Sequence, residues 1–430
     1  MAEQRSFMVN AARWAGYLCL FSSIVLLSHP IPRAQAFRGE RVEASLDIVE
    51  INDKGGLSVP DQVEKLTKRL AGARPTHVFL MAHGWLNTKA GAKESFEKML
   101  EVMTASADKH ELRPDGFRPA MIGVYWPSLA LEDNNSEDVK LLLERLPPQT
   151  AAKLTTILKK VGKIEADDLE ALFQKEMPRD KVAKVFSLAQ LFMGKDFAGP
   201  DGGDRPDLTA LDENDVKSLI DAVRIFSYWK MKKRAGTVGV NGARRLLMEL
   251  QAELPGAEFH LIGHSFGCKV WLSALSGKEK ESIPKPVHSL VLLQAAISTQ
   301  AFAEAIPTKD KPIKGGAHVI LADHRVKGPI VATFSALDGP VKRIYPLASR
   351  AAGHVGESEF HNRKLKKSAY QGMGAYGIDQ VKAREILAPG KKYGFEDGVH
   401  SINAETKIKG HKDIYEPEVA WLIWAAVLRK

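Results

Sequence analysis

Short, nearly continuous apolar runs alternate with amphipathic stretches along much of this 430-residue chain. Strands buried on both faces of a sheet require such runs, and crossover helices between parallel strands require amphipathic ones. The sequence therefore predicts an α/β fold with a mostly parallel central sheet flanked by helices. Strands are predicted at residues 41–51, 76–82, 120–126, 258–263, 287–293, 330–334 and 399–404, and helices at 90–107, 266–275 and 418–428.

The alternation stops between about residues 127 and 206, where the pattern becomes helical. Apolar residues recur there at three- and four-residue spacing in 153–161, 167–175 and 182–193, which indicates amphipathic helices. We therefore predict a helical insertion at about 127–206 within one large domain. Such an insertion either covers an active site as a lid or forms a bundle that packs on the core, and both alternatives stay open.

The amino-terminal residues have the pattern of an export signal. Arg5 and Arg13 bring positive charge to this end, and an apolar run occupies residues 14–27. Ala34 and Ala36 then form the small-x-small pattern that signal peptidases cut. The apolar run is shorter than the ~20 residues that cross a bilayer comfortably. We therefore expect cleavage after Ala36.

This boundary divides the chain into a signal peptide at 1–36 and a domain at 37–430, which is then periplasmic or secreted. An uncleaved amino-terminal membrane anchor is the alternative. Of the two cysteines, only Cys268 lies in the domain, where we expect it to be a small buried helix residue. No cluster of cysteine and histidine has the spacing of a zinc site, so no metal is expected.

The charge balance is basic but mixed. Lys and Arg total 61 against 52 Asp and Glu, a formal net charge of +9. A basic exterior favours peripheral contact with an anionic membrane surface or with acidic substrates. The two signs are interleaved, however, and aromatic residues do not alternate with basic ones as they do in nucleic-acid-binding proteins. We therefore expect no nucleic-acid partner.

The strongest chemical signal is the motif Gly263-His264-Ser265-Phe266-Gly267, between a predicted strand and a predicted helix. This is the strand–turn–helix context that a G-x-S-x-G nucleophile elbow requires. The tight turn forces the serine into a strained backbone conformation, and side chains at the two glycine positions would collide with neighbouring elements. Ser265 is therefore the candidate nucleophile.

With this motif and its flanks, the chain resembles the α/β-hydrolase superfamily, in the neighbourhood of lipases and esterases. The resemblance covers about residues 41–430 apart from the helical insertion. It implies a serine, acid, histidine triad in that chain order, and an oxyanion hole of backbone amides.

The resemblance implies an acid just after a later strand. Asp338 follows the predicted strand at 330–334 and is the expected acid, although an Asp before Gly-Pro also stabilises a turn without any catalytic role. Asp323 is the second candidate, but it precedes that strand. Glu396 and Asp397 are weaker candidates.

The triad histidine is expected last, on the loop after the final strand. His411 occupies this place and is similar to the histidine loops of lipase-like enzymes. His400 competes with it, but its place on a predicted strand suits a packed structural imidazole.

The oxyanion hole has a candidate directly after the predicted strand 76–82, at His83-Gly84-Trp85. In the family, a loop of this kind presents one main-chain amide, and the residue after the nucleophile presents the other. The resemblance therefore assigns the amides of Trp85 and Phe266. His83 is expected to support the loop rather than transfer protons.

Taken together, these patterns predict an exported serine hydrolase, a carboxylesterase or lipase. It would cleave small-molecule or lipid-like esters through an acyl-enzyme, without a metal or organic cofactor. The alternative is a non-catalytic, envelope-associated binding protein with the same fold. The two differ in geometry, since only the enzyme requires Ser265 and a histidine within hydrogen-bond distance.

Overall fold

The computed structural model of the chain describes residues 46–112, 116–128, 228, 230–277, 283–308, 311–351, 354–355, 358–359 and 370–429. Residues 44–430 belong to one compact unit, distinct from residues 1–43. The predicted signal peptide and nearly all of the predicted helical insertion lie outside the described residues. No described helix is both long enough and apolar enough to cross a bilayer.

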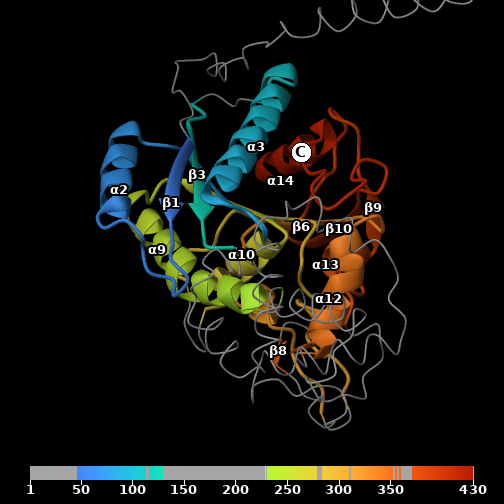
Figure 1. Ribbon diagram of the computed structural model, residues 1–430. Helices are drawn as coiled ribbons and strands as arrows, with labels where there is room; N and C mark the ends of the chain where they lie inside the picture. Colours follow the sequence, from blue (N-terminus) through green and yellow to red (C-terminus); the bar gives the residue numbers. More distant parts are fainter. Residues whose placement is uncertain are drawn as a thin grey trace, which may run out of the picture. The chain divides into compact units, whose positions relative to one another are not determined.

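Eight of the described strands form one sheet in which every neighbouring pair is parallel (Figure 1). These strands are β1 (Leu46–Glu50), β2 (His77–Ala82), β3 (Pro119–Tyr125), β4 (Glu258–His264), β5 (Ser289–Leu293), β6 (Pro329–Phe334), β9 (Ala383–Glu385) and β10 (Gly398–Asn403). Their order in the sheet is β1-β3-β2-β4-β5-β6-β10-β9. Separately, β7 (His354–Val355) and β8 (Ser358–Glu359) form an antiparallel pair. The predicted α/β class is confirmed, with a sheet that is parallel throughout.

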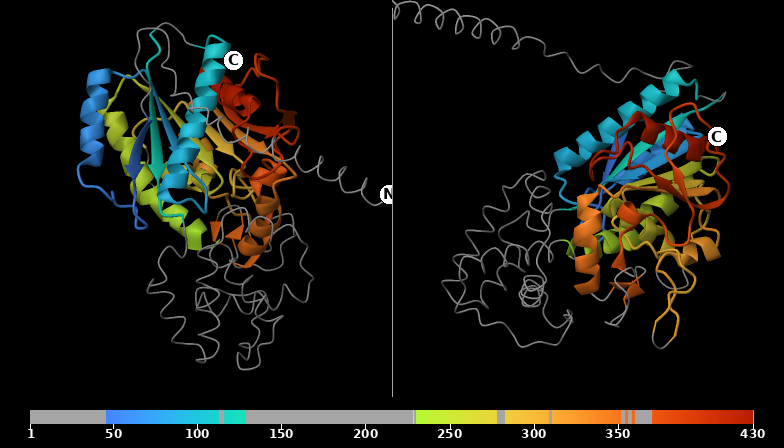
Figure 2. Two further views of the ribbon diagram at one scale, coloured as in Figure 1. Left: turned by 45° about the horizontal axis from the view of Figure 1, so that its top comes forward. Right: turned by 90° about the vertical axis from the view of Figure 1, so that its right-hand side faces the viewer.

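Helices cover both faces of this sheet, as the views in Figure 1 and Figure 2 show. One face carries α2 (Gln62–Ala73), α9 (Arg244–Glu253) and α10 (Phe266–Ser276), and the other carries α3 (Lys89–Lys109) and α14 (Pro417–Leu428). The remaining described helices are η3 (Val238–Ala243), α11 (His318–Ala322), α12 (Gly339–Ala351) and α13 (Met373–Tyr376). Because helices cover both faces, the central strands are buried on both sides, as their apolar runs predict.

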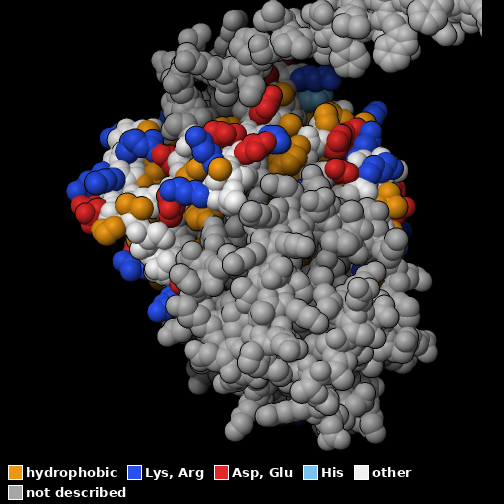
Figure 3. Space-filling model, in the orientation of Figure 1, with side chains coloured by type: hydrophobic (Ala, Val, Ile, Leu, Met, Phe, Trp, Pro, Cys, Tyr) orange, Lys and Arg blue, Asp and Glu red, His pale blue; other side chains and the backbone are white. Residues whose placement is uncertain are grey.

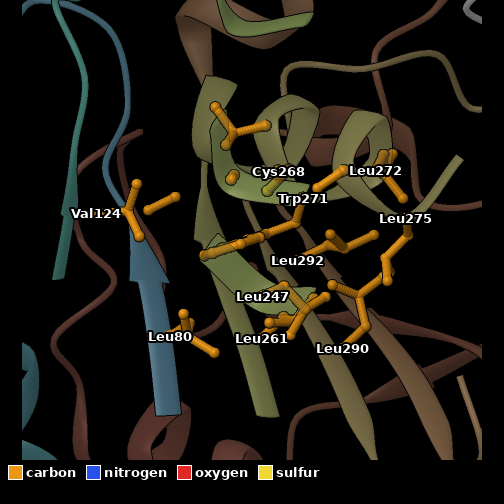
Figure 4. Close-up of a cluster of buried hydrophobic side chains, with 14 of the residues drawn as sticks. Leu80, Val124, Leu247, Leu261, Cys268, Trp271, Leu272, Leu275, Leu290 and Leu292 are labelled. Carbon is orange, nitrogen blue, oxygen red and sulfur yellow. The ribbon is translucent and has the colours of Figure 1, made fainter. Parts of the chain in front are cut away.

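The core between α10 and the sheet holds the carboxyl end of β4 in place (Figure 4). Trp271 of α10 is fully buried, and its Nε1–H donates to the Ile262 carbonyl at 2.9 Å. Burial of apolar surface stabilises such a contact by about 25 cal/mol per Å², so α10 is fixed on β4 along its length. Leucines from both strands and helices complete this core: Leu80, Leu247, Leu261, Leu272, Leu275, Leu290 and Leu292.

The chain order reverses between β2 and β4. From β2 the chain passes to β3 on one side, and it then crosses to β4 on the other side. In open parallel sheets, ligands bind outside the carboxyl ends of the strands at such a switch point. Since β2 ends at Ala82 and β4 at His264, the segments that follow these residues meet at that place.

Several described elements are not among the predicted ones, and three of them have identifiable reasons. The edge strand β9 has only three residues, too few to show an alternating pattern. Helix α12 contains Pro346, which argues against a helix interior. The π-helical turn η3 contains Gly239, where a Cβ would lie 2.4 Å from the Val270 carbonyl oxygen of α10. Close helix packing, rather than local periodicity, determines this turn.

The surface of the described residues has charges of both signs interspersed on the face shown in Figure 3. Helix α3 illustrates the arrangement, because Lys98 pairs with Glu94 at 2.7 Å and Lys93 with Glu97 at 3.6 Å. These exposed i,i+4 pairs each contribute only about 0.3–0.5 kcal/mol. Their main consequence is a mixed rather than a uniformly basic surface on this helix.

Candidate active site

The turn between β4 and α10 holds Ser265 in a strained conformation. Its backbone has φ 55° and ψ −119°, a positive φ that non-glycine residues rarely adopt. The Ser265 N–H donates to the Leu293 carbonyl at 3.0 Å, and its carbonyl accepts from the Cys268 N–H at 3.1 Å. Strain of this kind amounts to about 1–3 kcal/mol and persists only where the surroundings enforce it.

The two glycines of the elbow permit contacts that no side chain would allow. A Cβ on Gly267 would lie 2.0 Å from the Ala82 carbonyl oxygen at the end of β2, and one on Gly263 would lie 2.6 Å from the Cys268 nitrogen. The start of α10 therefore rests directly against the end of β2. Cys268 itself is fully buried in α10, as predicted, and burial raises the pKa of its thiol.

The structure brings Ser265, His411 and Asp338 into one hydrogen-bonded series. His411 Nε2 lies 2.8 Å from Ser265 Oγ, and His411 Nδ1 lies 2.8 Å from Asp338 Oδ2. Because a carboxylate accepts, the Nδ1–H donates to Asp338, which leaves Nε2 to accept from the serine hydroxyl. Ser265 is 4% exposed, and the imidazole of His411 is 14% exposed.

Asp338 is fully buried and held by further donors, one of which sequence reasoning missed. Its Oδ1 accepts from the Val341 N–H at 3.0 Å, and its Oδ2 also accepts from Gln294 Nε2 at 2.9 Å. Gln294 is itself fully buried and bonds to the hydroxyl of Thr333 and to the Gly374 carbonyl. It directly follows the apolar residues 290–293 of β5, and this abrupt change to a polar residue is the one signal that could have found it.

The other predicted acid candidates form contacts elsewhere. Asp323 pairs with Arg325 at 2.7 Å, and Asp397 lies 3.3 Å from Arg429. Within the described part of the chain, the structure brings neither of them, nor Glu396, into contact with His411.

His400 is the competing histidine, and it lies on β10 as predicted. Its Nε2–H donates to the Glu396 carbonyl at 2.8 Å, and its ring packs 4.9 Å from that of Phe395. Among the described contacts it therefore has a structural role, consistent with the packed imidazole that its position predicts.

The loop after β2 passes directly beside the serine. A Cβ on Gly84 would lie 2.8 Å from the Ser265 Cβ, so only glycine permits this approach. Phe266 is the first residue of α10, and the helix has no internal acceptor for its N–H. Within the described residues, neither the Phe266 amide nor that of Trp85 donates to another backbone group. As far as the described residues show, both amides are therefore available to donate to a ligand oxygen beside Ser265.

His83 supports this loop as a neutral imidazole. Its Nδ1–H donates to the Gly84 carbonyl at 2.8 Å, and its Nε2 accepts from the Trp126 N–H at 3.2 Å. The Trp126 indole donates in turn to the His83 carbonyl at 3.0 Å. Burial lowers the pKa of His83 to about 4, so both ring nitrogens keep these roles at neutral pH.

Asn87 is a second supporting residue that sequence reasoning missed. Its side-chain Nδ2 donates to the carbonyls of Gly84 at 3.1 Å and Trp85 at 3.2 Å. Its own N–H donates to Ser128 Oγ at 3.0 Å. The neighbouring Leu86 has φ 62°, so the loop is strained and needs these bonds. A lone Asn after a strand gives no signal of this role in the sequence.

His264 connects the nucleophile turn to the histidine loop. Its Nε2–H donates to the carbonyl of His411 at 2.8 Å, and a Cβ on Gly84 would lie 3.3 Å from its Nδ1. Burial, together with the nearby His411, lowers the pKa of His264 to about 3. This residue is thus a neutral donor that holds the backbone of His411 and so positions its imidazole.

A small cavity adjoins the site on the α3 face of the sheet. It extends between the first half of α3, at Ser95 and Phe96, and the loop at Ile414 and Tyr415, with His264 in its wall. Ser265 is not among its lining residues. The cavity therefore lies behind the loops at His83 and Tyr415 rather than over Ser265.

Comparison of the chain with protein-family models, with curated proteins and with solved structures finds no match. The functional argument therefore depends on the geometry of the site and on the sequence motifs that form it.

The contact at Gly267 generates a stability prediction. In Gly267→Ala, the new methyl group meets the Ala82 carbonyl, which we expect to lower the free energy of unfolding by about 1–3 kcal/mol. Gly72→Ala is the matched control, because no atom lies within 4 Å of its Cβ position in α2, and it should stabilise by up to about 1 kcal/mol. Urea unfolding measures both, and equal stabilities of the two variants would contradict the packing argument.

The neutral buried histidines generate a pH prediction. His83 and His264 have folded pKa values of about 4 and about 3, whereas an unfolded histidine titrates near about 6.5. Below about pH 6.5 the unfolded chain therefore binds more protons, so stability falls as pH decreases, by up to about 1.4 kcal/mol per pH unit per histidine. Urea unfolding at several pH values between about 7 and 5 measures this slope.

His264→Gln is the control for that measurement. It removes one of the titrating groups. The unfolding free energy of this variant should therefore depend less steeply on pH than that of the parent, by the contribution of about one proton. A parent protein whose stability does not change over this range would show that these histidines are not buried in their neutral form.

Proposed function

We propose that this protein is a serine hydrolase of the α/β-hydrolase type that cleaves ester-type substrates through an acyl-enzyme. The observation that carries the proposal is the series from Ser265 through His411 to Asp338, with 2.8 Å at both hydrogen bonds. Acyl transfer requires a nucleophile, a general base and a carboxylate that orients the base, and these three residues are of the required types in the required order.

In the proposed mechanism, Ser265 Oγ attacks the ester carbonyl while His411 Nε2 takes its proton. The amides of Trp85 and Phe266 stabilise the oxyanion of the tetrahedral intermediate. His411 then protonates the leaving alcohol, and the acyl-enzyme forms. Asp338 orients the imidazole and stabilises its protonated form. A water molecule repeats the sequence on the acyl-enzyme and releases the acid.

The supporting contacts favour an enzyme over a binding protein with the same fold. A binding protein has no need of a serine at φ 55°, whose strain opposes folding by about 1–3 kcal/mol. It also has no need of Gln294 donating to the carboxylate of Asp338, whereas the bond from the Val341 N–H is an ordinary cap at the start of α12. These features are accounted for when the hydroxyl and the imidazole must be held ready for proton transfer.

Aromatic rings near the nucleophile support an apolar or aromatic ester as substrate. The Tyr228 ring lies 4.7 Å from that of Phe266 and 5.6 Å from that of Trp85. Phe266 and Tyr228 are buried in the core, whereas Trp85 is partly exposed. The ring of Trp85 is thus the apolar wall beside the elbow, which suits an acyl chain or an aryl group better than a charged one. The narrower proposal of a lipid-like substrate depends on the helical insertion, which lies outside the described residues.

The proposed location is outside the cytoplasm. It depends on the signal-like residues 1–36, and an amino-terminal membrane anchor is its alternative. Peripheral contact with anionic membrane surfaces belongs to the same proposal and depends on the net charge of +9.

The enzymatic proposal is tested by covalent labelling with a fluorophosphonate probe. We expect the parent protein to be labelled and Ser265→Ala to be unreactive, because the probe bonds to the activated hydroxyl. Asp338→Asn should retain the fold but lose about 10⁴-fold in ester hydrolysis, since the imidazole is then held in the wrong tautomer. Ser276→Ala, at the far end of α10, is the control and should label like the parent. A folded parent that does not react contradicts the proposal.

The substrate class is tested with p-nitrophenyl esters of increasing acyl length. An apolar wall predicts that kcat/KM rises as methylene groups are added, by up to about 0.8 kcal/mol, or roughly fourfold, for each buried CH₂. Rates of hydrolysis at substrate concentrations well below KM give kcat/KM for each ester. Equal rates across the series would contradict an apolar acyl site while leaving the triad intact.

A further inference from the structure

A second cluster of chemically active side chains lies at the opposite edge of the sheet from Ser265. His77 is the first residue of β2, and Glu258 is the first residue of β4 and its register partner. His260 lies two residues farther along β4, on the same face, because side chains alternate along a strand. The three side chains therefore converge at the amino-terminal ends of the two central strands.

The distances within this cluster are close to those of a metal ligand set. His77 Nδ1 lies 3.1 Å from His260 Nε2, and Glu258 Oε2 lies 3.7 Å from the former and 4.0 Å from the latter. In a tetrahedral zinc site with ligands at about 2.0–2.2 Å, the ligand atoms are about 3.3–3.5 Å apart. Because the Glu258 side chain is 46% exposed, a small rotation brings its oxygen to that separation.

A hydrogen bond to the second ring nitrogen can orient a histidine so that its other nitrogen faces a metal ion. His260 is 1% exposed, and its Nδ1 lies 2.8 Å from Ser289 Oγ. If Nδ1–H donates to this hydroxyl, the Nε2 lone pair faces His77. Metal-binding histidines are commonly held in this way through their second nitrogen. Nearby His288 differs, because its Nδ1 accepts from the Phe259 N–H at 3.2 Å, which places the proton on its Nε2 and excludes it as a ligand.

Aromatic rings enclose the cluster on its inner side. The Phe117 ring lies 4.5 Å from that of His77, and the Phe79 ring lies 5.0 Å from that of His260. Trp424 of α14 packs against both phenylalanines. The partly exposed Glu258 leaves the outer side accessible to solvent, so an ion can enter from there and a water molecule can occupy a fourth position.

We propose that His77, Glu258 and His260 bind one divalent transition-metal ion of the zinc class. Two imidazoles and one carboxylate are the ligand types that this class prefers. The ion would connect β2 to β4 at the end remote from the proposed catalytic residues, so its effect is on stability rather than on the chemistry. The sequence did not indicate the site, because His77 and His260 are 183 residues apart.

The test uses the chain without a histidine tag, stripped with EDTA and titrated with Co²⁺ as a spectroscopic probe. We expect one tightly bound Co²⁺ with the visible absorption of a tetrahedral site, displaced by Zn²⁺, and a higher unfolding temperature in the presence of the ion. His77→Gln and Glu258→Gln should each weaken binding more than about 100-fold, since loss of an outer-sphere partner alone weakens it about 10–100-fold.

His288→Gln and His324→Gln are the controls. The first removes a neighbouring imidazole that we exclude as a ligand, and the second removes an exposed histidine on a distant turn. Both should bind Co²⁺ within about tenfold of the parent. The proposal is overturned if the parent shows no tetrahedral Co²⁺ spectrum, in which case the cluster is a hydrogen-bonded histidine pair. It is also overturned if binding is unchanged in His77→Gln and Glu258→Gln, or is lost equally in His288→Gln.

Discussion

The close contact between the start of α10 and the end of β2 is the constraint on which the candidate site depends. Gly267 lies so near the Ala82 carbonyl that any side chain would overlap it. This contact fixes the position of the start of α10 relative to the sheet. It thereby also fixes the tight turn that holds Ser265 at positive φ. It also keeps the loop after β2 beside the serine, where Gly84 again permits an approach that a Cβ would prevent. One packing contact thus positions the candidate nucleophile and both candidate oxyanion amides.

A shell of neutral hydrogen-bonding groups, buried or half-buried, surrounds these elements. His83 and His264 are kept uncharged by burial, so each acts as a fixed donor to a backbone carbonyl. Asn87 and Gln294 hold the oxyanion loop and the Asp338 carboxylate with uncharged amides. Fixed dipoles of this kind need no reorganisation during a reaction, which is the physical basis of electrostatic preorganisation.

The two central strands carry chemically active residues at both of their ends. At the carboxyl ends of β2 and β4 lie the oxyanion loop and Ser265, where the chain order reverses. At their amino ends lie His77, Glu258 and His260. Because these strands are neighbours paired along six residues, an ion at one end would restrain the strands that position the other. The two proposed sites thus lie at opposite ends of the same pair of strands.

The sequence alone determined the α/β class, the central strands and the Gly263–Gly267 elbow, because apolar periodicity and glycine spacing are local properties. It also favoured Asp338 as the acid and His411 as the histidine over a few alternatives. Only the tertiary structure brought Asp338 and His411 to Ser265 rather than the alternatives, since convergence of distant loops has no local pattern. Gln294 and the His77–His260 pair lay beyond sequence reasoning for the same reason: their partners are distant in the chain, and only sheet order makes them neighbours.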